Sequence, residues 1–406
     1  MKRILPVIIA FGLSSSILFS TTPAMAGDSG TSVHGVQLAG QTDGSEPFSG
    51  SALCLPDAYP NLNSGCLPLG PAQILSDLAR QGLVLPLRPL PASAPDPKLN
   101  QMPEQYLKVS STGDVPLYPS LEAAENHETG SSLAGTSRGL RYLAVVQRVN
   151  NDKGIFYNLT SGDWINAGDA DVSCCSSSGR FQGLLFQSNP TNQFGWIISV
   201  TDVKTSPGYN SPGTGEQLNQ ETVVQIYGMQ EKDGTNWLLI GVDRWVDDNY
   251  VGRVTLNTTP PAGVTNNRWI EVNDGEQTLS VYDHGQLVFA TLIATGVKPF
   301  YTRPGLFHIY KKKALETMRG AFEADKSDFY YLQDVPWTMY FDDARALHGA
   351  YWRTHYGYMA SHGCVNLSPG DSNWLFNWAK EGDWVYVWDP TGKTPTDPKY
   401  YGAGGA

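Results

Sequence analysis

Over most of its length the chain alternates short apolar runs with polar turns, a pattern typical of β-strands rather than of long helices. The runs that carry this signal are 142–149, 155–157, 223–227, 237–240, 268–272, 278–282, 287–294 and 384–388. Asp-Gly and His-Gly pairs separate several of these runs, and such pairs favour tight hairpin turns. The sequence therefore predicts a mainly β protein.

Two of these regions repeat each other at a fixed distance. The pairs Asp152 and Asp233, Phe156 and Trp237, Leu159 and Ile240, and Trp164 and Trp245 are each separated by 81 positions. We interpret this offset as two copies of a small β-barrel unit, a first β-module at 112–180 and a second β-module at 181–256. The pattern resembles bacterial SH3-like wall-associated modules. A single β-sandwich with coincidental aromatic positions is the alternative interpretation.

Two segments carry helix signals. Residues 72–81 place apolar side chains on one face, follow Pro71 and stop at Gly82, which predicts a short amphipathic helix. Near the end of the chain, Ser368-Pro369 opens a second helix at 371–380, which ends before Gly382.

Composition indicates where the remaining segments begin and end. Residues 27–50 are rich in Gly, Ser and Thr, which predicts a flexible arm, and 51–111 hold the first helix, two cysteines and a proline-rich exit. A Thr/Pro/Gly linker at 258–263 precedes a third β-region at 265–389, whose first strands form a β-meander. Residues 390–406 remain as a C-terminal tail.

The first residues predict export. Lys2 and Arg3 precede an apolar stretch from Ile4 to Phe19, and Ala24-Met25-Ala26 fits a cleavage site, so residues 1–26 are expected to be a signal peptide. An uncleaved N-terminal anchor is the alternative. No later stretch approaches the roughly 18 apolar residues of a second span. We therefore expect a secreted, extracytoplasmic protein.

The charge balance argues against a nucleic-acid partner. The chain has 28 Lys+Arg and 39 Asp+Glu, a net charge of −11. Loss of Lys2 and Arg3 with the leader makes the balance −13. Such a surface repels phosphate backbones.

The five cysteines leave one without a partner in the simplest pairing scheme. Cys54 and Cys66 lie close together in a Pro/Gly/Asn-rich segment and are expected to form a disulfide. Cys174 and Cys175 are adjacent, and they either join each other in a strained ring or cross-link elsewhere. Cys364 then remains as a free thiol, which is interpreted as a nucleophile; a buried, inert thiol is the alternative.

Three histidines accompany Cys364 in a short stretch of sequence: His348, His355 and His362. Thiol catalysis requires a base near the sulfur and donors for the developing oxyanion. Gly363 allows close approach of a substrate to the backbone. A zinc site of three His and one Cys is chemically possible, but the spacing fits no compact ligand pattern. On spacing alone, any of the three histidines can be the base.

A longer signature surrounds these residues. His348-Gly349, followed by Ser361-His362-Gly363-Cys364-Val365-Asn366-Leu367, resembles the motif of the L,D-transpeptidase (YkuD-type) catalytic domain. The resemblance covers about 267–389 and includes Gly305-Leu306-Phe307-His308-Ile309 and Val335-Pro336-Trp337-Thr338-Met339-Tyr340-Phe341. It implies a YkuD-type β-sandwich with a short helix, preceded here by the two SH3-like β-modules.

The resemblance also assigns roles to single residues. It implies that Cys364 is the nucleophile, that His348 takes its proton, and that the Gly349 carbonyl orients the imidazole. It implies that Ser361, His362 and the amides around Gly363 line the oxyanion region. Tyr340, Trp337, Arg319 and Asn366 are the candidates for substrate binding. His355 matches no functional position of the motif.

Two departures from the family pattern concern contacts rather than chemistry. Many members carry arginine where this chain has Asn366, so a contact to a substrate carboxylate is in doubt. The usual Thr-Pro-x-Gly turn appears as Thr302-Arg303-Pro304-Gly305, which predicts a rearranged turn.

The function implied by the resemblance is 3→3 cross-linking of peptidoglycan. The thiolate attacks the diamino acid of a tetrapeptide stem, D-alanine leaves, and a neighbouring stem resolves the thioester. The expected partners are peptidoglycan stem peptides, with carbapenem-type β-lactams as covalent inhibitors, and no metal or organic cofactor is needed. An L,D-carboxypeptidase that uses water as acceptor and a non-catalytic wall-binding protein are the alternatives. The two β-modules are expected to hold the enzyme at the cell wall or to brace it.

Overall fold

The computed structural model describes residues 70–173 and 181–401. Within these residues the protein is mainly β, as predicted. The chain divides into two compact units, one ending at Arg80 and one starting at Gln81. Several predictions lie outside the described residues: the signal peptide 1–26, the flexible arm 27–50, the disulfide Cys54–Cys66, and the pairing of Cys174 and Cys175.

The first unit contributes one described element, the helix α1 (Gly70–Arg80). It starts two residues before the predicted helix and ends one residue before its predicted end. Gly82, which follows it, has φ +95°. A helix cannot continue through that conformation, so glycine ends this one as the sequence indicates.

The first β-module belongs to the second unit and contributes the strands β8-β2-β5-β6-β7, in that order, to a nine-stranded sheet, accompanied by the separate hairpin β3-β4. Its elements are β2 (Gln105–Val109), β3 (Val115–Leu117), α2 (Leu121–Glu125), β4 (Ser131–Leu133), β5 (Arg141–Asn151), β6 (Gly154–Leu159), β7 (Trp164–Asn166) and β8 (Val172–Ser173). Leu107, Leu143 and Ile165 lie in its core. Strand β2 comes from the segment 51–111, so that segment supplies a strand of the module's sheet.

The second β-module consists of two small sheets, β12-β11-β16-β15-β14 and β13-β10-β17. Its elements are β10 (Gln193–Ile197), β11 (Thr201–Lys204), β12 (Gly213–Leu218), β13 (Val223–Ile226), β14 (Gly228–Lys232), β15 (Thr235–Gly241), β16 (Arg244–Asp247), η3 (Asp248–Tyr250) and β17 (Val251–Val254). Ile197, Val203 and Leu238 belong to one buried cluster that joins the two sheets.

The repeat seen in the sequence is also a repeat of strand pairing. Phe156 on β6 lies opposite Asn166 on β7, and Trp237 on β15 lies opposite Asp247 on β16, each pair shifted by 81 positions. The hairpins before them close at the same relative position, Asn151 opposite Gly154 and Lys232 opposite Thr235. Around these three-stranded units the neighbouring strands differ, and the SH3-like class stays a prediction.

The C-terminal domain, defined as the described residues from 267 to 401, contains two sheets. One has the order β20-β19-β18-β26-β21, and in the other β25, β24, β23 and β22 are neighbours in that order. This second sheet continues into the first β-module, because β23 also pairs in parallel with β5. The elements are β18 (Arg268–Asn273), β19 (Thr278–Asp283), β20 (Gln286–Leu292), β21 (Gly305–His308), β22 (Lys311–Gly320), β23 (Tyr330–Asp342), β24 (Arg345–Gly349), β25 (Val365–Leu367), α3 (Pro369–Trp378), β26 (Trp384–Trp388) and η4 (Pro398–Tyr400). The predicted β-meander is confirmed as β18-β19-β20.

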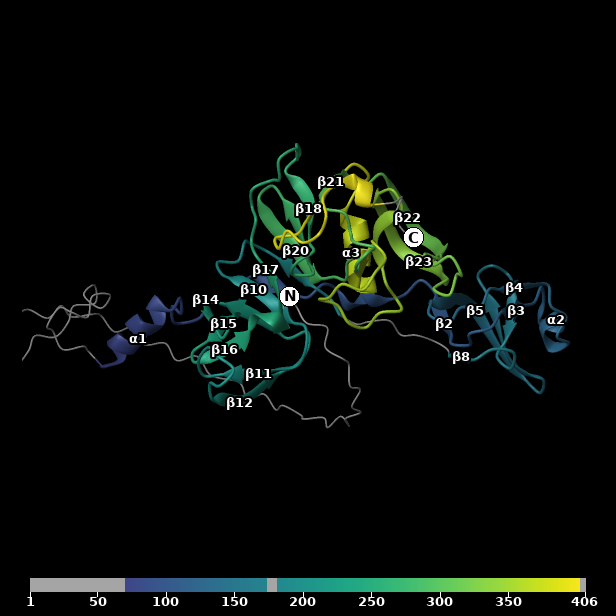
Figure 1. Ribbon diagram of the computed structural model, residues 1–406, viewed down its shortest axis with the longest axis horizontal. Helices are drawn as coiled ribbons and strands as arrows, with labels where there is room; N and C mark the ends of the chain where they lie inside the picture. The colour runs from purple at the N-terminus through teal and green to yellow at the C-terminus, as the bar shows by residue number, and fades with distance from the viewer. Residues whose placement is uncertain (1–69, 174–180, 402–406) are drawn as a thin grey trace, which may run out of the picture. The chain divides into compact units, whose positions relative to one another are not determined.

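The main core of the C-terminal domain lies between its two sheets. Val272 and Phe289 contribute from one sheet, Phe341 and Leu347 from the other, and Leu375 from α3. Figure 1 shows α3 between the strands of the two sheets. The helix begins after Ser368, whose side chain accepts the Asp371 N–H, and Pro369 occupies the first helical position. Helix α3 begins two residues after the end of β25. Packing of the helix into the core therefore also holds the end of that strand.

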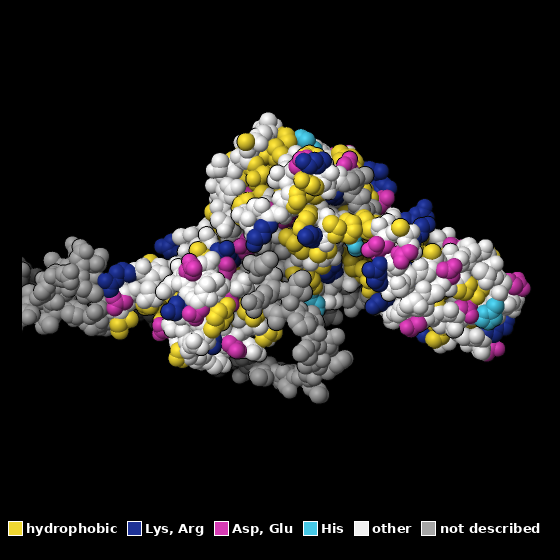
Figure 2. Space-filling model, viewed as in Figure 1, with side chains coloured by type: hydrophobic (Ala, Val, Ile, Leu, Met, Phe, Trp, Pro, Cys, Tyr) yellow, Lys and Arg dark blue, Asp and Glu magenta, His cyan; other side chains and the backbone are white. Residues whose placement is uncertain are grey.

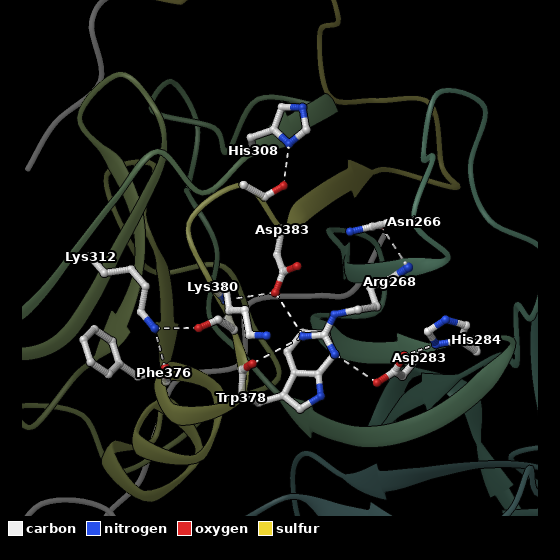
Figure 3. A network of polar contacts seen from close by, with 12 residues as sticks. Asn266, Arg268, Asp283, His284, His308, Lys312, Phe376, Trp378, Lys380 and Asp383 are labelled. Carbon is white, nitrogen blue, oxygen red and sulfur yellow. Dashed lines mark hydrogen bonds and ion pairs between the residues drawn. The ribbon is translucent and has the colours of Figure 1, made fainter.

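A polar network holds the last turn of α3 against both sheets (Figure 3). Arg268 donates to Asp283 on β19 (2.9 Å), to Asp383 (3.1 Å) and to the Trp378 carbonyl (3.3 Å), and its guanidinium stacks over the Trp378 ring. Lys312 on β22 donates to the carbonyls of Phe376 and Ala379, both at 2.6 Å. A cation beside the last carbonyls of a helix stabilises the helix end.

Two short linker strands extend the first sheet. β1 (Ala92–Ser93) pairs with β9 (Leu184–Phe186), and β9 pairs with β20. The Gly183 N–H next to β9 donates to the buried carboxylate of Asp371 at 2.8 Å. The chain segments that enter and leave the first β-module are thus part of the C-terminal domain's sheet.

Helices in the described residues are all too short or too polar to cross a membrane. On the face drawn in Figure 2, acidic and basic side chains are interspersed, and neither sign forms a continuous field.

Candidate active site

Strand pairing brings the two leading catalytic candidates to neighbouring strands. β24 and β25 pair in parallel, with Leu347 opposite Val365 and His348 opposite Asn366. Because side chains alternate between the faces of a sheet, His348 and Asn366 share one face, and Cys364, two positions before Asn366, follows them on that face. His348 and Cys364 are therefore diagonal neighbours across two strands, although sixteen positions apart in the sequence.

The thiol of Cys364 is almost enclosed. Cys364 is 5% exposed and packs in one cluster with Tyr340 and Ala346. Its sulfur lies 3.7 Å from the Ala344 carbonyl, which accepts its weak hydrogen bond. Burial raises the pKa of the Cys364 thiol to about 11, while the Ala346 backbone and the charge of Arg345 act in the opposite direction. The thiol is therefore protonated at neutral pH unless a base takes its proton.

The imidazole of His348 is equally buried, at 2% exposure. Burial lowers the pKa of His348 to about 4; the Gly349 carbonyl opposes that shift, and Arg353 adds to it. Nδ1 of His348 meets full hydrogen-bonding geometry with no group among the described residues, and the Gly349 backbone acts on its pKa as a weak hydrogen-bond partner. At neutral pH the ring is uncharged and able to accept a proton.

A tight turn precedes the thiol and is fixed by its own polar groups. The Ser361 hydroxyl donates to the Cys364 carbonyl at 2.5 Å and accepts the Gly363 N–H at 3.2 Å. The Thr302 hydroxyl donates to the Gly363 carbonyl at 2.9 Å. Gly363 has φ +120°, a conformation that favours glycine. Ser361 therefore orders the turn through its hydrogen bonds to the backbone.

His362 lies in an aromatic cluster. Its ring stacks on Phe322 at 4.5 Å between centroids and lies 5.0 Å from Phe300 and 6.3 Å from Tyr330. Burial lowers the pKa of His362, and Asp328 opposes that shift. The residue as a whole is exposed to solvent, so it lies at the rim of the site.

The structure separates the four candidates for substrate binding. Tyr340 is in the Cys364 cluster. Asn366 is buried opposite His348, and its backbone pairs with Ala294 on a neighbouring segment.

The other two candidates lie away from this cluster. A Cβ on Gly349 would lie 3.3 Å from the Trp337 ring, so Trp337 packs against Gly349, and its carbonyl accepts a hydrogen bond from Ser372 on α3. Arg319 lies opposite Tyr331 on β22 and β23. Arg319 and Tyr331 line a cavity of about 890 Å³ that the first β-module borders. Tyr330 lies on the other face of β23 and stacks with His362.

The third histidine of the stretch is not near this site in any described contact. His355 is exposed and interacts with the adjacent Thr354 hydroxyl at 2.7 Å. Within residues 70–173 and 181–401, no group of three His, Cys, Asp or Glu side chains has a metal-binding arrangement.

Sequence reasoning missed a buried charge cluster next to the thiol. Arg345 and Arg303 both pair with Asp342, Arg345 Nη1 at 2.9 Å and Arg303 Nε at 2.9 Å. The signal was present as an arginine directly before Ala346-Leu347-His348 in an otherwise apolar strand. It was not recognised because strand alternation does not show whether a charged residue faces solvent or a buried partner.

A buried thiol, a buried imidazole on the next strand and a hydrogen-bonded glycine turn form an arrangement suited to acyl transfer. Residues 267–387 match the family model for the L,D-transpeptidase catalytic domain, YkuD. Residues 267–387 thus belong to the class of YkuD-type L,D-transpeptidase catalytic domains, which are acyltransferases. From here we call this region the catalytic domain.

Several solved structures are also similar to part of the chain. An L,D-transpeptidase from Stackebrandtia nassauensis is 28% identical over 32% of this chain and 58% of that chain, with a TM-score of 0.25. The catalytic domain of the Enterococcus faecium L,D-transpeptidase is 28% identical over 31% of this chain and 100% of that domain, with a TM-score of 0.28. L,D-transpeptidase 1 of Mycobacterium tuberculosis is 22% identical over 30% of this chain and 60% of that chain, with a TM-score of 0.26. No match was found among curated proteins.

Proposed function

We propose that this protein is a cysteine-dependent L,D-transpeptidase that forms 3→3 cross-links between peptidoglycan stem peptides. The proposal rests on one observation: Cys364, directly before β25, and His348 on the adjacent parallel strand β24 share one face. The match of residues 267–387 to the catalytic domain supports the reaction class.

The two pKa shifts indicate how the reaction starts. With the pKa of Cys364 raised to about 11 and that of His348 lowered to about 4, the resting pair is a neutral thiol and a neutral imidazole. Proton transfer therefore accompanies nucleophilic attack and does not precede it. His348 takes the thiol proton as Sγ bonds to the carbonyl carbon of the diamino acid at its L-centre.

The remaining steps return every proton. The oxyanion faces the backbone amides at the Gly363–Cys364 turn, and the C–N bond to D-alanine breaks as His348 protonates the leaving amine. A side-chain amine of a neighbouring stem then attacks the thioester and gives a proton to His348. Cleavage of the C–S bond releases the cross-linked product, and the sulfur recovers its proton from His348.

The proposed substrate also indicates where the protein acts and which compounds inhibit it. Stem peptides occur outside the cytoplasm, which agrees with the leader expected over 1–26. We propose that the protein is secreted and associated with the cell wall. Carbapenem-type β-lactams are proposed to acylate Cys364 by opening of the lactam amide, as expected for this family.

Purified protein incubated with tetrapeptide-bearing muropeptides tests this function by mass spectrometry. Cross-linked dimers with loss of D-alanine are expected from the unaltered protein and not from Cys364→Ala. Tripeptide products without dimers would identify a carboxypeptidase. No product, together with no mass gain on addition of meropenem, would identify a non-catalytic wall-binding protein.

A further inference from the structure

A hydrogen bond from a distant part of the chain holds the peptide group between Gly363 and Cys364 in the catalytic turn, defined as residues 361–364. The Thr302 hydroxyl donates to the Gly363 carbonyl at 2.9 Å, although the two residues are 61 positions apart. The same hydroxyl accepts the Gly296 N–H at 2.9 Å. A threonine hydroxyl has one proton and can also accept, so the Gly296 N–H occupies its acceptor side and leaves the proton for the Gly363 carbonyl.

This peptide group lies between two others that the turn fixes by itself. Ser361 accepts the Gly363 N–H at 3.2 Å and donates to the Cys364 carbonyl at 2.5 Å, which holds the peptide groups before and after it. Gly363 has φ +120°, and a glycine turns about its backbone bonds more freely than any other residue. The bond from Thr302 therefore selects one orientation of a peptide group that the glycine would otherwise leave less constrained.

The orientation of this peptide group sets the direction of the Cys364 amide. A peptide group is planar and trans, so its carbonyl and its N–H point in opposite directions. When Thr302 holds the Gly363 carbonyl, the Cys364 N–H is held on the opposite side of the same plane. In the proposed reaction this amide faces the oxyanion, and a donor stabilises that charge best when it is aimed at it before the charge forms.

The position of Thr302 is itself fixed by contacts along the turn. Thr302 is 1% exposed, and a hydrogen bond is stronger in such a low-dielectric environment. Its partner Gly296 pairs with Ser361 in a parallel bridge, and the Thr295 carbonyl accepts the Ser361 N–H at 3.0 Å. A Cβ on Gly296 would lie only 2.0 Å from the Phe300 carbonyl oxygen, so glycine lets the chain fold back tightly enough to bring Thr302 to the turn.

We propose that Thr302 is a positioning residue, which aims the Cys364 amide at the negative charge formed on the substrate carbonyl. The hydroxyl acts through the Gly363–Cys364 peptide group and not on the substrate itself. The inference rests on the proposed function, because that function places an oxyanion at this amide. It gives a reason for a threonine at the start of the Thr302-Arg303-Pro304-Gly305 turn.

Two substitutions at Thr302 separate the effect of its hydroxyl from that of its shape. Thr302→Val keeps the branched shape but removes the donor, so the Gly363–Cys364 peptide group loses this anchor. Thr302→Ser keeps the hydroxyl and is expected to keep the rate. Thr278→Val is the matched control. Thr278 is also buried, at 2% exposure, and its hydroxyl also donates to a backbone carbonyl, that of Arg253 in the second β-module, at 3.1 Å.

Two reactions of Cys364 differ in whether they form an oxyanion. With meropenem, Sγ adds to the lactam carbonyl, the oxyanion collapses as the C–N bond breaks, and the thiol proton passes through His348 to the nitrogen. With iodoacetamide, Sγ displaces iodide from a saturated carbon, the thiol proton is released, and no oxyanion forms. In the full chain, Thr302→Val is expected to slow acylation about 10- to 100-fold. Alkylation is expected to change by less than about twofold, because it needs the sulfur and not the amide.

Mass spectrometry of the peptide that contains Cys364 gives both rates. Selective slowing of acylation in Thr302→Val, with rates near those of the unaltered protein in Thr302→Ser and Thr278→Val, supports the inference. Equal slowing of both reactions, equal slowing in Thr278→Val, an unchanged acylation rate, or no acylation of the unaltered protein overturns it. Cross-linking of muropeptides together with unchanged acylation in Thr302→Val would retain the proposed function and reject the role of Thr302. Selective slowing without any cross-linking would retain the role of Thr302 and reject the proposed function.

Discussion

Ile198 of the second β-module lies directly against Gly357 of the segment that connects His348 to Cys364. A Cβ on Gly357 would lie 2.4 Å from Ile198 Cγ2. The same segment is hydrogen-bonded to the end of the first sheet, because the N–H groups of Gly357 and Ala360 donate to Ile293 and Thr295 at 2.9 Å. The second β-module therefore supports the segment that leads into the catalytic turn.

Gly357→Ala is expected to reduce stability by about 2 kcal/mol, because the methyl group overlaps Ile198 and the residue has φ +93°. Gly382→Ala is the matched control. Gly382 has the same φ of +93°, but nothing lies within 4 Å of the added Cβ. Urea unfolding compares the two, and a larger loss for Gly357→Ala that Ile198→Ala partly restores is predicted. Equal losses would show that the contact with the module contributes nothing.

The pH dependence of turnover should reflect the low pKa of His348. A base with a pKa near 4 is deprotonated, and therefore able to accept a proton, at every pH well above 4. The acidic limb of kcat/KM is expected near pH 4 to 5, below the ordinary histidine value of about 6.5. His362→Asn should keep this limb, whereas His348→Asn should lower kcat by about a hundredfold or more. An acidic limb near 6.5 in the unaltered protein would contradict the burial argument.

The buried carboxyl of Asp371 is expected to make the free energy of unfolding depend on pH. This carboxyl is fully buried and accepts the Thr291 hydroxyl at 2.6 Å and the Gly183 N–H, yet burial raises its pKa to about 7. The folded state then holds a proton that the unfolded chain releases above about pH 4, so stability falls as pH rises from about 4 to about 7 and is constant above that. The loss attributable to this group is at most about 4 kcal/mol.

Asp371→Asn should remove that part of the pH dependence. The expected result is a flatter curve of unfolding free energy against pH between 4 and 7, measured by urea unfolding. Asp383→Asn is a useful comparison, because Asp383 is also paired, with Arg268 at 3.1 Å, but lies at the other end of α3. A slope that persists unchanged in Asp371→Asn would exclude Asp371 as its source.

The Arg268 network offers a test of how α3 is held. Arg268→Met removes two ion pairs and the donor to the Trp378 carbonyl but retains apolar contact with the Trp378 ring. A loss of about 2 to 3 kcal/mol is expected, because Asp383 is left nearly buried without its partner. Arg268→Lys should recover part of it in urea unfolding. No change in either variant would show that the network does not stabilise the helix end.

Local signals in the sequence predicted local structure well. Proline at the start and glycine after the end predicted α1 within two residues, and Ser368-Pro369 predicted the start of α3. The His284-Gly285 pair predicted a hairpin turn. Both residues have the positive φ that a two-residue hairpin requires, +50° and +78°. The offset of 81 positions predicted a repeated strand register, because aromatic and apolar residues that fill equivalent positions recur at equal spacing.

Long-range pairing was not predictable in the same way. β9 joins β20 through Leu185 and Phe289, residues more than a hundred positions apart, and no local pattern marks a linker as an edge strand. The buried pairing of Arg345 with Asp342 was missed for a similar reason, since a charged residue in a strand is usually solvated. The candidates Trp337 and Arg319 came from the family resemblance, and the structure places them against Gly349 and in the cavity beside the first β-module.

The most direct test of the account is the mass of the intermediate formed when purified protein is mixed briefly with a tetrapeptide stem and quenched in acid. We expect a covalent adduct equal to the stem without its terminal D-alanine, located on the peptide that contains Cys364 and lost in Cys364→Ala. An adduct on any other residue, or cross-linked dimers produced by Cys364→Ala, would contradict it.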